Sequence, residues 1–410
     1  MPGLRIFRFY RRQRKKFFYL YLLCFLSFAA CSVRGYIPDS VTVVRGEPVT
    51  LGSFLPVTKT VKSRDEAAVS SGNPGSAEYG VYELECRLFG MVPVKNVTVH
   101  ITEEEQVIPC GIPIGIYVRT AGVYVVDLAE IEEAGGGTVS PAQHILNAGD
   151  YITAVDGTVI ETKEDLTAAV SASDGAVLTL TVRRGGETVD CEVAPVKNAD
   201  GQYRIGVWVR DDMAGIGTLT YVTEDGEFGA LGHCISDTDT GSRIEIERGT
   251  LYLADILSII KGEKGNPGEL AGQIRYTESR VLGDIEENRE DGIFGTLTSL
   301  PEELSEAEPV SVGYKQEVEE GPAQILIELD GELKTYAIEI ESVELNAAEV
   351  NKSIRFRVTD EELIEKTGGI IQGFSGVPIL QGGKIIGAVT HVFVSNPREG
   401  CGIFIEDMMK

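Results

Sequence analysis

Residues 373–380 read Gly-Phe-Ser-Gly-Val-Pro-Ile-Leu. A serine, Ser375, stands between two glycines at the start of an apolar run. Glycine lets the backbone bend sharply and lets a ligand approach it closely. Such a turn can present a nucleophilic hydroxyl and aim two backbone N–H groups, those of Gly373 and Ser375, at an oxyanion. A tight hairpin with a solvent-facing serine fits the same residues. Evidence for a general base is therefore needed to choose between a nucleophile and a structural turn.

The bulk composition limits the class of protein. A chain of 410 residues is too long for one ordinary core and predicts two or three domains. The formal net charge of −26 argues against nucleic acid as a partner. No glycine-rich phosphate loop follows a strand and opens a helix, and the seven cysteines show no Cys-x-x-Cys spacing. The sequence therefore predicts neither a nucleotide cofactor nor a metal.

The N-terminus reads as an export segment. An apolar run over residues 17–31 follows a basic stretch, and residues 1–34 contain no acidic residue. Positive charge before roughly 15 apolar residues is typical of a signal peptide or a short signal anchor. We therefore expect residues 1–34 to be a signal or anchor and the rest of the chain to be exported and membrane-associated.

Three regions follow the export segment. Residues 35–105 alternate apolar and polar side chains and predict a β region, with a small polar linker at 63–78. Residues 106–198 form a compact unit of strands and one short helix, in which Thr162 and Asp165 give the helix a capping-box-like start. Residues 199–410 are rich in strands and punctuated by glycine; only residues 251–261 have the pattern of an amphipathic helix. The last region fits a pair of β-barrels better than an α/β sheet.

The order of motifs in residues 106–198 resembles a bacterial PDZ domain. It carries Ser-Pro-Ala at 140–142, Ala-Gly-Asp at 148–150 and Val-Asp-Gly at 155–157, and then the short helix. PDZ domains bind extended peptides as an added strand, usually at a free C-terminus. The resemblance implies that the carboxylate-binding loop is Ile114-Gly115-Ile116 with Pro113 before it. A PDZ fold that only packs against its neighbour is the alternative.

A general base must hydrogen-bond the nucleophile and titrate near neutrality, which favours histidine. The chain has four histidines: His100, His144, His233 and His391. His233 precedes Ser375, as in the His, Asp, Ser order of chymotrypsin-like peptidases, and lies among glycines and small residues. We predict His233 as the base and keep His391, on an alternating strand after the serine, in reserve.

The third member of a triad is an aspartate that orients the imidazole. Several aspartates lie between the base and the nucleophile, and spacing alone does not choose among them. The candidates are Asp237, Asp239, Asp255, Asp284 and Asp360.

Five motifs together resemble the stage IV sporulation protein B family of serine peptidases. They are Gly-Ala-Leu-Gly-His at 229–233, Gly-Asn-Pro-Gly-Glu at 265–269, Gly-Ile-Phe-Gly-Thr-Leu at 292–297, the glycine-rich stretch 368–376, and Gly-Ala-Val-Thr-His-Val-Phe-Val at 387–394. The resemblance covers the anchor, the PDZ-like unit and residues 199–410. It implies the catalytic set His233, Asp360 and Ser375, with Asp255 and Asp284 still open as the acid.

The resemblance also implies a biological role. The fold would be mainly β, with a membrane anchor or signal, a PDZ-like α+β domain and a chymotrypsin-like double β-barrel. The enzyme would lie between the forespore and mother-cell membranes. It would cleave itself and a membrane-bound inhibitory protein, which activates intramembrane processing of a sigma factor precursor. The PDZ domain would bind a peptide or C-terminus, on the target or on a second copy of the chain.

Two other functions use the same residues. A non-catalytic PDZ adaptor at the membrane surface would keep the peptidase-like domain for binding only. A cysteine peptidase based on Cys234 has less support, because no turn presents that thiol.

Overall fold

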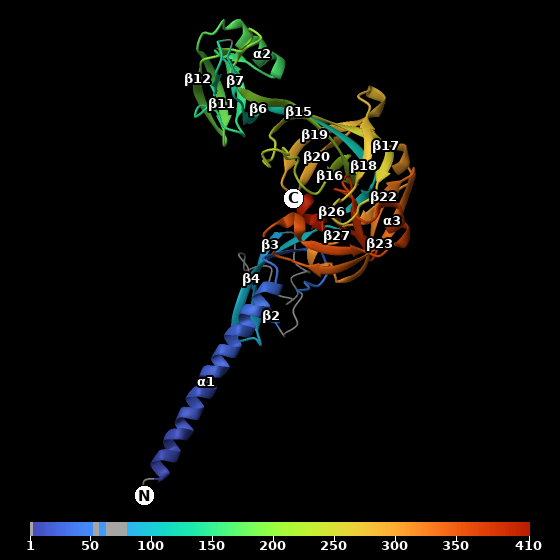
Figure 1. The fold of residues 1–410 in the computed structure, drawn as a ribbon. Helices are drawn as coiled ribbons and strands as arrows, with labels where there is room; N and C mark the ends of the chain where they lie inside the picture. Colours follow the sequence, from blue (N-terminus) through green and yellow to red (C-terminus); the bar gives the residue numbers. More distant parts are fainter. Residues whose placement is uncertain (1–2, 52–56, 63–79, 134) are drawn as a thin grey trace.

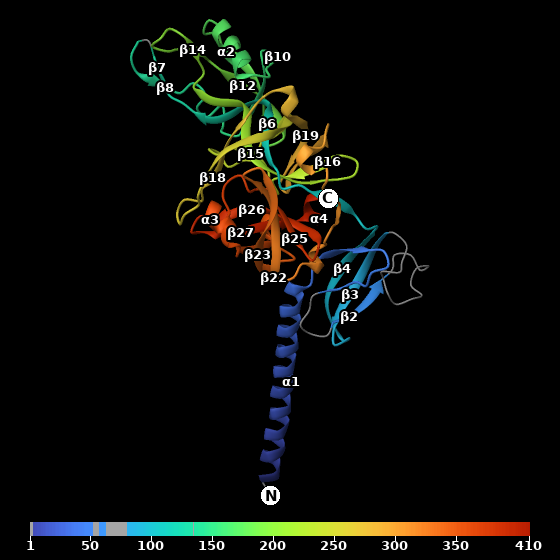
Figure 2. The ribbon, with the colours of Figure 1, turned by 90° about the vertical axis from the view of Figure 1, so that its right-hand side faces the viewer.

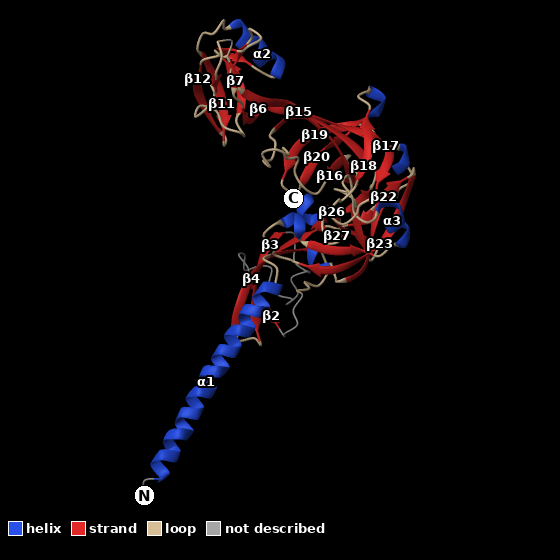
Figure 3. Cartoon of the chain, in the orientation of Figure 1, coloured by secondary structure: helices blue, strands red, loops and turns tan. Residues whose placement is uncertain are grey.

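The computed structural model describes residues 3–51, 57–62, 80–133 and 135–410. It is mainly β: a long N-terminal helix, a small sheet, two β-barrels and a PDZ unit at the far end from the helix (Figure 1, Figure 3). The fold class predicted from the sequence is confirmed. The predicted linker at 63–78 lies outside the described residues.

Helix α1 (Gly3–Tyr36) projects from the body of the molecule (Figure 2). Its segment Lys16–Tyr36, 21 residues long, is long and apolar enough to cross a membrane, as a signal sequence also is. Aromatic side chains such as Phe17 and Phe28 are exposed along it, whereas Val33 and the following Ile37 are buried against the small sheet. The helix thus ends in contact with the first folded unit of the chain.

The small sheet has the strand order β1-β4-β3-β2. Its strands are β1 (Ser40–Val44), β2 (Val57–Lys62), β3 (Gly80–Leu88) and β4 (Val92–Thr102). Alternation along β3 and β4 places Leu84, Leu88, Val97 and Val99 in its core, as period-2 burial requires.

The first barrel closes because β6 pairs with both β17 and β15. Its six strands are β6 (Pro113–Leu128), β15 (Val207–Val222), β16 (Glu227–Ala230), β17 (Ile246–Ile260), β19 (Val281–Arg289) and β20 (Gly292–Leu297). Strands β5 (Gln106–Pro109), β18 (Glu269–Ile274) and β21 (Val310–Ser311) and the short turns η2 (Glu278–Arg280) and η3 (Glu302–Leu304) border it. The helix predicted for 251–261 is wrong, because this stretch pairs with β6, β18 and β19 as β17.

The PDZ unit is inserted between two strands of this barrel. Strands β6 and β15 run on from the barrel into the PDZ sheet (Figure 1). There they join β9 (Tyr151–Val155), β11 (Leu178–Arg184) and β12 (Glu187–Val193), with helix α2 (Lys163–Ala172) packed alongside. Short pairs β7 (Ile131–Glu132) with β8 (Thr138–Val139) and β13 (Val196–Lys197) with β14 (Tyr203–Arg204), and β10 (Thr158–Val159), complete it.

Two details of the PDZ prediction have different outcomes. The capping box of α2 is confirmed, since Thr162 and Asp165 exchange side chain to backbone hydrogen bonds. The boundary at residue 106 is corrected: β5 borders the barrel and the first half of β6 belongs to it, because their partners include barrel strands.

The second barrel is closed in the order β22-β23-β24-β27-β26-β25. Its strands are β22 (Gly321–Leu329), β23 (Glu332–Val343), β24 (Ile354–Val358), β25 (Pro378–Gln381), β26 (Lys384–Phe393) and β27 (Asn396–Phe404). Helices α3 (Glu361–Thr367) and α4 (Ile405–Met408) and the turns η4 (Lys315–Glu317) and η5 (Val350–Lys352) lie around it. The stretch 373–380 leads from α3 into β25, facing the first barrel.

Candidate active site

Ser375 sits on a turn that only glycines can flank. Gly373 has φ +98° and Gly376 has φ +96°, values that side-chain-bearing residues rarely adopt. A Cβ on Gly376 would lie 2.1 Å from the Thr218 carbonyl oxygen. The turn is therefore pressed against β15 of the first barrel. The half-buried Ser375 hydroxyl donates to the Thr390 carbonyl at 3.1 Å.

The N–H groups of Gly373 and Ser375 have no acceptor within the described part of the chain. By contrast, the N–H groups of Gln372, Phe374 and Gly376 each donate to a backbone carbonyl. Across each planar peptide the carbonyl points the opposite way and is held: Gln372 O accepts from Leu270 N at 2.9 Å, and Phe374 O accepts from Val377 N at 3.0 Å. Two fixed, unpaired donors beside a serine hydroxyl are the arrangement that stabilises an oxyanion.

His233 follows a tight turn at the end of β16, where Leu231 and Gly232 both have positive φ. Its Nδ1 lies 2.9 Å from the Cys234 carbonyl oxygen, so Nδ1 carries the proton in the neutral ring and Nε2 is the basic atom. Burial lowers the pKa of His233 below the ordinary value, partly offset by that hydrogen bond. The ring is thus held neutral and in one tautomer.

The histidine turn and the serine turn are packed together. A Cβ on Gly376 would lie 2.6 Å from the Leu231 nitrogen, and one on Gly232 would lie 2.8 Å from the Thr390 methyl group. Thr390, whose carbonyl accepts from Ser375, therefore touches both turns. The structure brings the predicted base and nucleophile into one neighbourhood between the barrels.

His391, the reserve base, lies in the same place. Its ring centroid is 5.5 Å from that of His233. Loss of solvation, then the nearby His233 and Lys352, lowers the pKa of His391 to about 4. His100 lies on β4 of the small sheet and His144 in a PDZ loop, so neither belongs to this site.

The carboxylate of Asp360 has backbone partners. It is the N-cap of α3: one carboxylate oxygen accepts from Leu363 N at 3.1 Å and the other from Ala337 N at 3.3 Å. No hydrogen bond joins it to an imidazole among the described residues. Since α3 leads directly to the serine turn, the cap holds the start of that segment.

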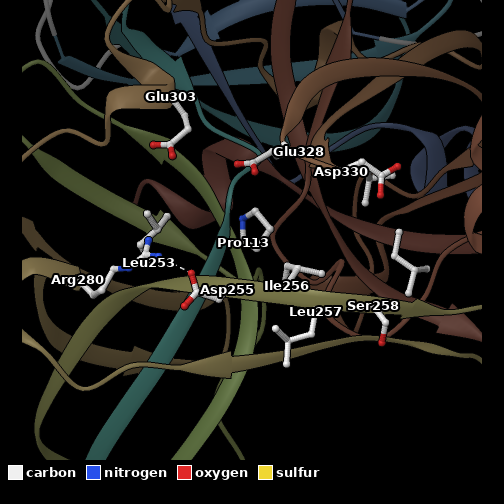
Figure 4. A pocket seen from close by; sticks show the side chains of 14 residues that line it. Pro113, Leu253, Asp255, Ile256, Leu257, Ser258, Arg280, Glu303, Glu328 and Asp330 are labelled. Atoms are coloured by element: carbon white, nitrogen blue, oxygen red, sulfur yellow. Dashed lines mark hydrogen bonds and ion pairs between the residues drawn. The ribbon is translucent and has the colours of Figure 1, made fainter.

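Asp255 and Asp284 lie elsewhere on the first barrel. Asp255 lies in a pocket of about 350 Å³ and pairs with Arg280, opposite Glu303 and Glu328 (Figure 4). Arg275 binds it as well, at 2.9 Å. Asp284 is exposed on β19.

Asp237 and Asp239 connect the histidine turn to the PDZ-bearing strand, because both pair with Arg210 of β15. Tyr124 of β6 extends this contact, with its hydroxyl 2.6 Å from that of Thr240. The loop after His233 is thus held by the two strands that carry the PDZ unit.

Cys234 does not have the environment of a nucleophile. Burial raises the pKa of its thiol, which lies 3.2 Å from the Ser236 hydroxyl and also contacts Glu290. A thiol with a raised pKa is a poor source of thiolate. Within the described residues no cluster of His, Cys, Asp and Glu has the geometry of a metal site.

The predicted carboxylate-binding loop is in the wrong place for a PDZ ligand. Ile114, Gly115 and Ile116 lie in β6 within the first barrel, paired with β15 and β17, and the two isoleucines are buried in its core. Gly115 faces the side chain of Ile274. No peptide can reach this segment without opening the barrel, so this assignment is corrected.

The PDZ groove lies instead between α2 and the start of β15. A cavity of about 800 Å³ is lined by Leu166 and Val170 of α2 and by the segment Ile205-Gly206-Val207. Trp208, the single tryptophan of the chain, also lines it and is 67% exposed. Among the described strands, Val207–Val209 pairs only with β6, so its other edge is open for an added strand.

Sequence reasoning missed this groove and the residues on β15 that hold the serine turn. The signal for the groove was a second Ile-Gly-hydrophobic motif at 205–207, next to the tryptophan. Thr218 of β15 gave no such signal, because nothing in the sequence distinguishes it from other threonines within strands.

Two family models match parts of this chain. Residues 201–409 match the family model described as SpoIVB peptidase S55, and residues 136–184 match a PDZ-domain model. The active form of the Rv3671c protease of M. tuberculosis is similar at 12% identity, over 48% of this chain and 72% of that chain, with a TM-score of 0.25. The HtrA-type protease AlgW with a decapeptide is similar at 12% identity, over 51% of this chain and 52% of that chain, with a TM-score of 0.27.

Two further similarities are shorter. The PDZ domain of an SdrC-like protein from Listeria monocytogenes is 21% identical, over 22% of this chain and 86% of that chain, with a TM-score of 0.18. A curated protein named putative zinc metalloprotease CPE1693, from Clostridium perfringens, is 32% identical over 69 residues. These are 17% of this chain, and the match spans only 21% of that relative.

Proposed function

The chain belongs to the SpoIVB peptidase S55 family of serine peptidases, and we propose that it is a serine endopeptidase with Ser375 as nucleophile and His233 as general base. The observation that carries this proposal is the packing of the two turns around Thr390, beside the two unpaired N–H groups of Gly373 and Ser375.

The proposed reaction begins with rotation of the Ser375 hydroxyl from the Thr390 carbonyl toward Nε2 of His233. Nε2 takes the hydroxyl proton as the serine oxygen bonds to the scissile carbonyl carbon. The N–H groups of Gly373 and Ser375 hold the oxyanion. The C–N bond then breaks, the imidazolium gives its proton to the leaving amine, and water hydrolyses the acyl-enzyme by the same route in reverse.

The imidazole is oriented in this proposal by the Cys234 carbonyl. That contact fixes the Nδ1 proton, which is the task that a triad aspartate performs in related mechanisms. The sequence prediction of Asp360 as the acid stays untested, and its capping of α3 supports a different task, the placement of the segment that leads to Ser375.

We further propose the sporulation role that the family implies. The enzyme would be exported and held at a membrane by α1, in the space between forespore and mother-cell membranes. It would cleave itself and a membrane-bound inhibitory protein, and so release intramembrane processing of a sigma factor precursor. A PDZ groove that takes an extended peptide supports a protein substrate or a second copy of the chain as partner.

The direct test uses the full chain in detergent. Wild type and Ser375→Ala are incubated alone, and fragment masses are followed over time. We expect fragments from the wild type only, with both proteins equally folded by circular dichroism. Equal fragmentation of the two would exclude Ser375 as nucleophile.

A second candidate, the non-catalytic PDZ adaptor, is favoured by one observation. The Ser375 hydroxyl is bonded to a backbone carbonyl and not to an imidazole. If the protein is an adaptor, the wild type yields no fragments in this assay. A C-terminal peptide would still bind the groove beside Trp208.

A further inference from the structure

Thr218 of β15 is a fully buried polar residue in contact with the serine turn. Its hydroxyl donates to the Gly373 carbonyl at 2.8 Å. Its backbone N–H donates to the Ser375 carbonyl at 2.9 Å. One residue of the first barrel therefore binds two carbonyls of the second barrel's nucleophile turn.

These two bonds bracket the peptide group between Phe374 and Ser375. Its N–H is the oxyanion donor of Ser375, and its direction depends on the peptide planes on either side of it. With both flanking carbonyls tied to Thr218, the intervening plane has little freedom to turn. The bracket thus fixes the aim of one unpaired donor.

Thr218 also reaches the histidine turn. Its carbonyl accepts from Leu231 N at 3.4 Å, two residues before His233. The hydroxyl and the N–H of Thr218 thereby bind the serine turn, and its carbonyl binds the histidine turn. Since the turns come from different barrels, Thr218 is a point at which their relative position is set.

We propose that Thr218 is a positioning residue for peptide hydrolysis, holding the oxyanion donor of Ser375 in register with the His233 turn. This rests on the proposed serine peptidase activity. The essential group is the hydroxyl, because without it the half-buried Gly373 carbonyl loses its donor and the turn loses one of its two ties to Thr218. Thr218 contacts no reacting atom in this mechanism; it acts through the turns.

The test compares Thr218→Val, Thr218→Ser and Thr218→Ala with wild type, as full chains in detergent. Valine keeps the shape without the hydroxyl, and serine keeps the hydroxyl without the methyl group. Alanine removes the hydroxyl and the methyl group together, so it places no new apolar atom beside the Gly373 carbonyl. Thr120→Val is the matched control: Thr120 is also buried, and its hydroxyl donates to the Gly122 carbonyl at 2.6 Å, outside the site. A fluorophosphonate that labels reactive serines measures the labelling rate at Ser375 without knowledge of the substrate.

We expect Thr218→Val and Thr218→Ala to slow labelling and self-cleavage by roughly 10- to 100-fold, the scale of a small misplacement of catalytic groups. Thr218→Ser stays within about threefold of wild type by the same argument. Thr120→Val lowers the melting temperature as Thr218→Val does, yet keeps the labelling rate.

Labelling of Thr218→Val or Thr218→Ala at the rate of Thr120→Val overturns the positioning role. If Thr218→Val does not fold, the ratio of Thr218→Ala to Thr218→Ser decides in the same way. Failure of the proposed function is distinct, because then Ser375 is not labelled in the wild type either.

Discussion

The hydroxyl of Ser375 donates to the backbone carbonyl of Thr390 at 3.1 Å. This bond holds the hydroxyl on the residue whose side chain also contacts Gly232 of the histidine turn. In the proposed mechanism the hydroxyl has to leave this carbonyl and turn toward His233. In the structure the serine hydroxyl is thus held by the Thr390 carbonyl, whereas the proposed base is His233.

Ser375→Ala is expected to abolish hydrolysis while leaving the fold intact. The substitution removes one partly buried hydrogen bond, which contributes about 0.5–1.5 kcal/mol. Thermal unfolding of the full chain measures this change in stability. A loss several times larger would mean that the serine has mainly a structural role.

Asp360→Asn separates the capping role from the triad role. Asparagine is about as good an N-cap as aspartate, but it carries no charge to stabilise an imidazolium. We expect Asp360→Asn to keep most of the activity, and Asp360→Ala to lose about 0.5–2 kcal/mol of stability with part of the activity. Steady-state hydrolysis and thermal melts provide both numbers. A fall of about 10⁴ in kcat for Asp360→Asn would instead establish Asp360 as the triad acid.

The pH profile should report the lowered pKa of His233. The base acts in its neutral form, and burial lowers its pKa below the ordinary value of about 6.5. The acidic limb of kcat/KM is therefore expected below pH 6.5, with the rate level from there to about pH 8. A limb centred above about 6.5 would contradict the buried, neutral base.

His391 makes a separate contribution to stability. Its pKa is about 4 in the folded chain, below the unfolded value, so the unfolded chain binds more protons between the two values. The contribution is complete above about pH 6.5 and is lost as the pH falls toward 4. His391→Gln should flatten the decline of melting temperature over this window while leaving the acidic limb of activity in place. Disappearance of that limb would make His391 the base.

The PDZ groove can be tested with Trp208. It is the single tryptophan, so no other indole contributes to its fluorescence. An apolar peptide with a free C-terminus is expected to shift the emission saturably, and the same peptide amidated at its C-terminus should bind more weakly. Thr167→Glu, an exposed change on the groove face of α2, should weaken binding through repulsion of the carboxylate. Equal affinity of the free and amidated peptides would contradict C-terminal recognition.

Local signals in the sequence predicted the elements that depend on local chemistry. The cap of α2 was readable because Thr162 and Asp165 meet within one turn. The turn at Ser375 was predictable because glycine is the residue that readily adopts the positive φ found at Gly373 and Gly376. Alternation predicted the strands of the small sheet, whose buried residues recur at every second position.

Features that depend on tertiary pairing could not be read in this way. The Ile-Gly-hydrophobic pattern occurs at 114–116 and at 205–207, and only strand pairing shows that the first lies in a barrel core. Residues 251–261 have apolar spacing that suits a helix, yet their backbone groups are taken by neighbouring strands. Thr218 resembles any strand threonine until the serine turn from the other barrel is packed against it.

The most direct measurement of the central claim is the site of fluorophosphonate attachment in the full chain, read by peptide mass mapping. We predict one adduct, on Ser375, in the wild type, and a labelling rate reduced by at least about 100-fold in His233→Ala. An adduct on another residue, or undiminished labelling of Ser375 without His233, would contradict the serine peptidase mechanism.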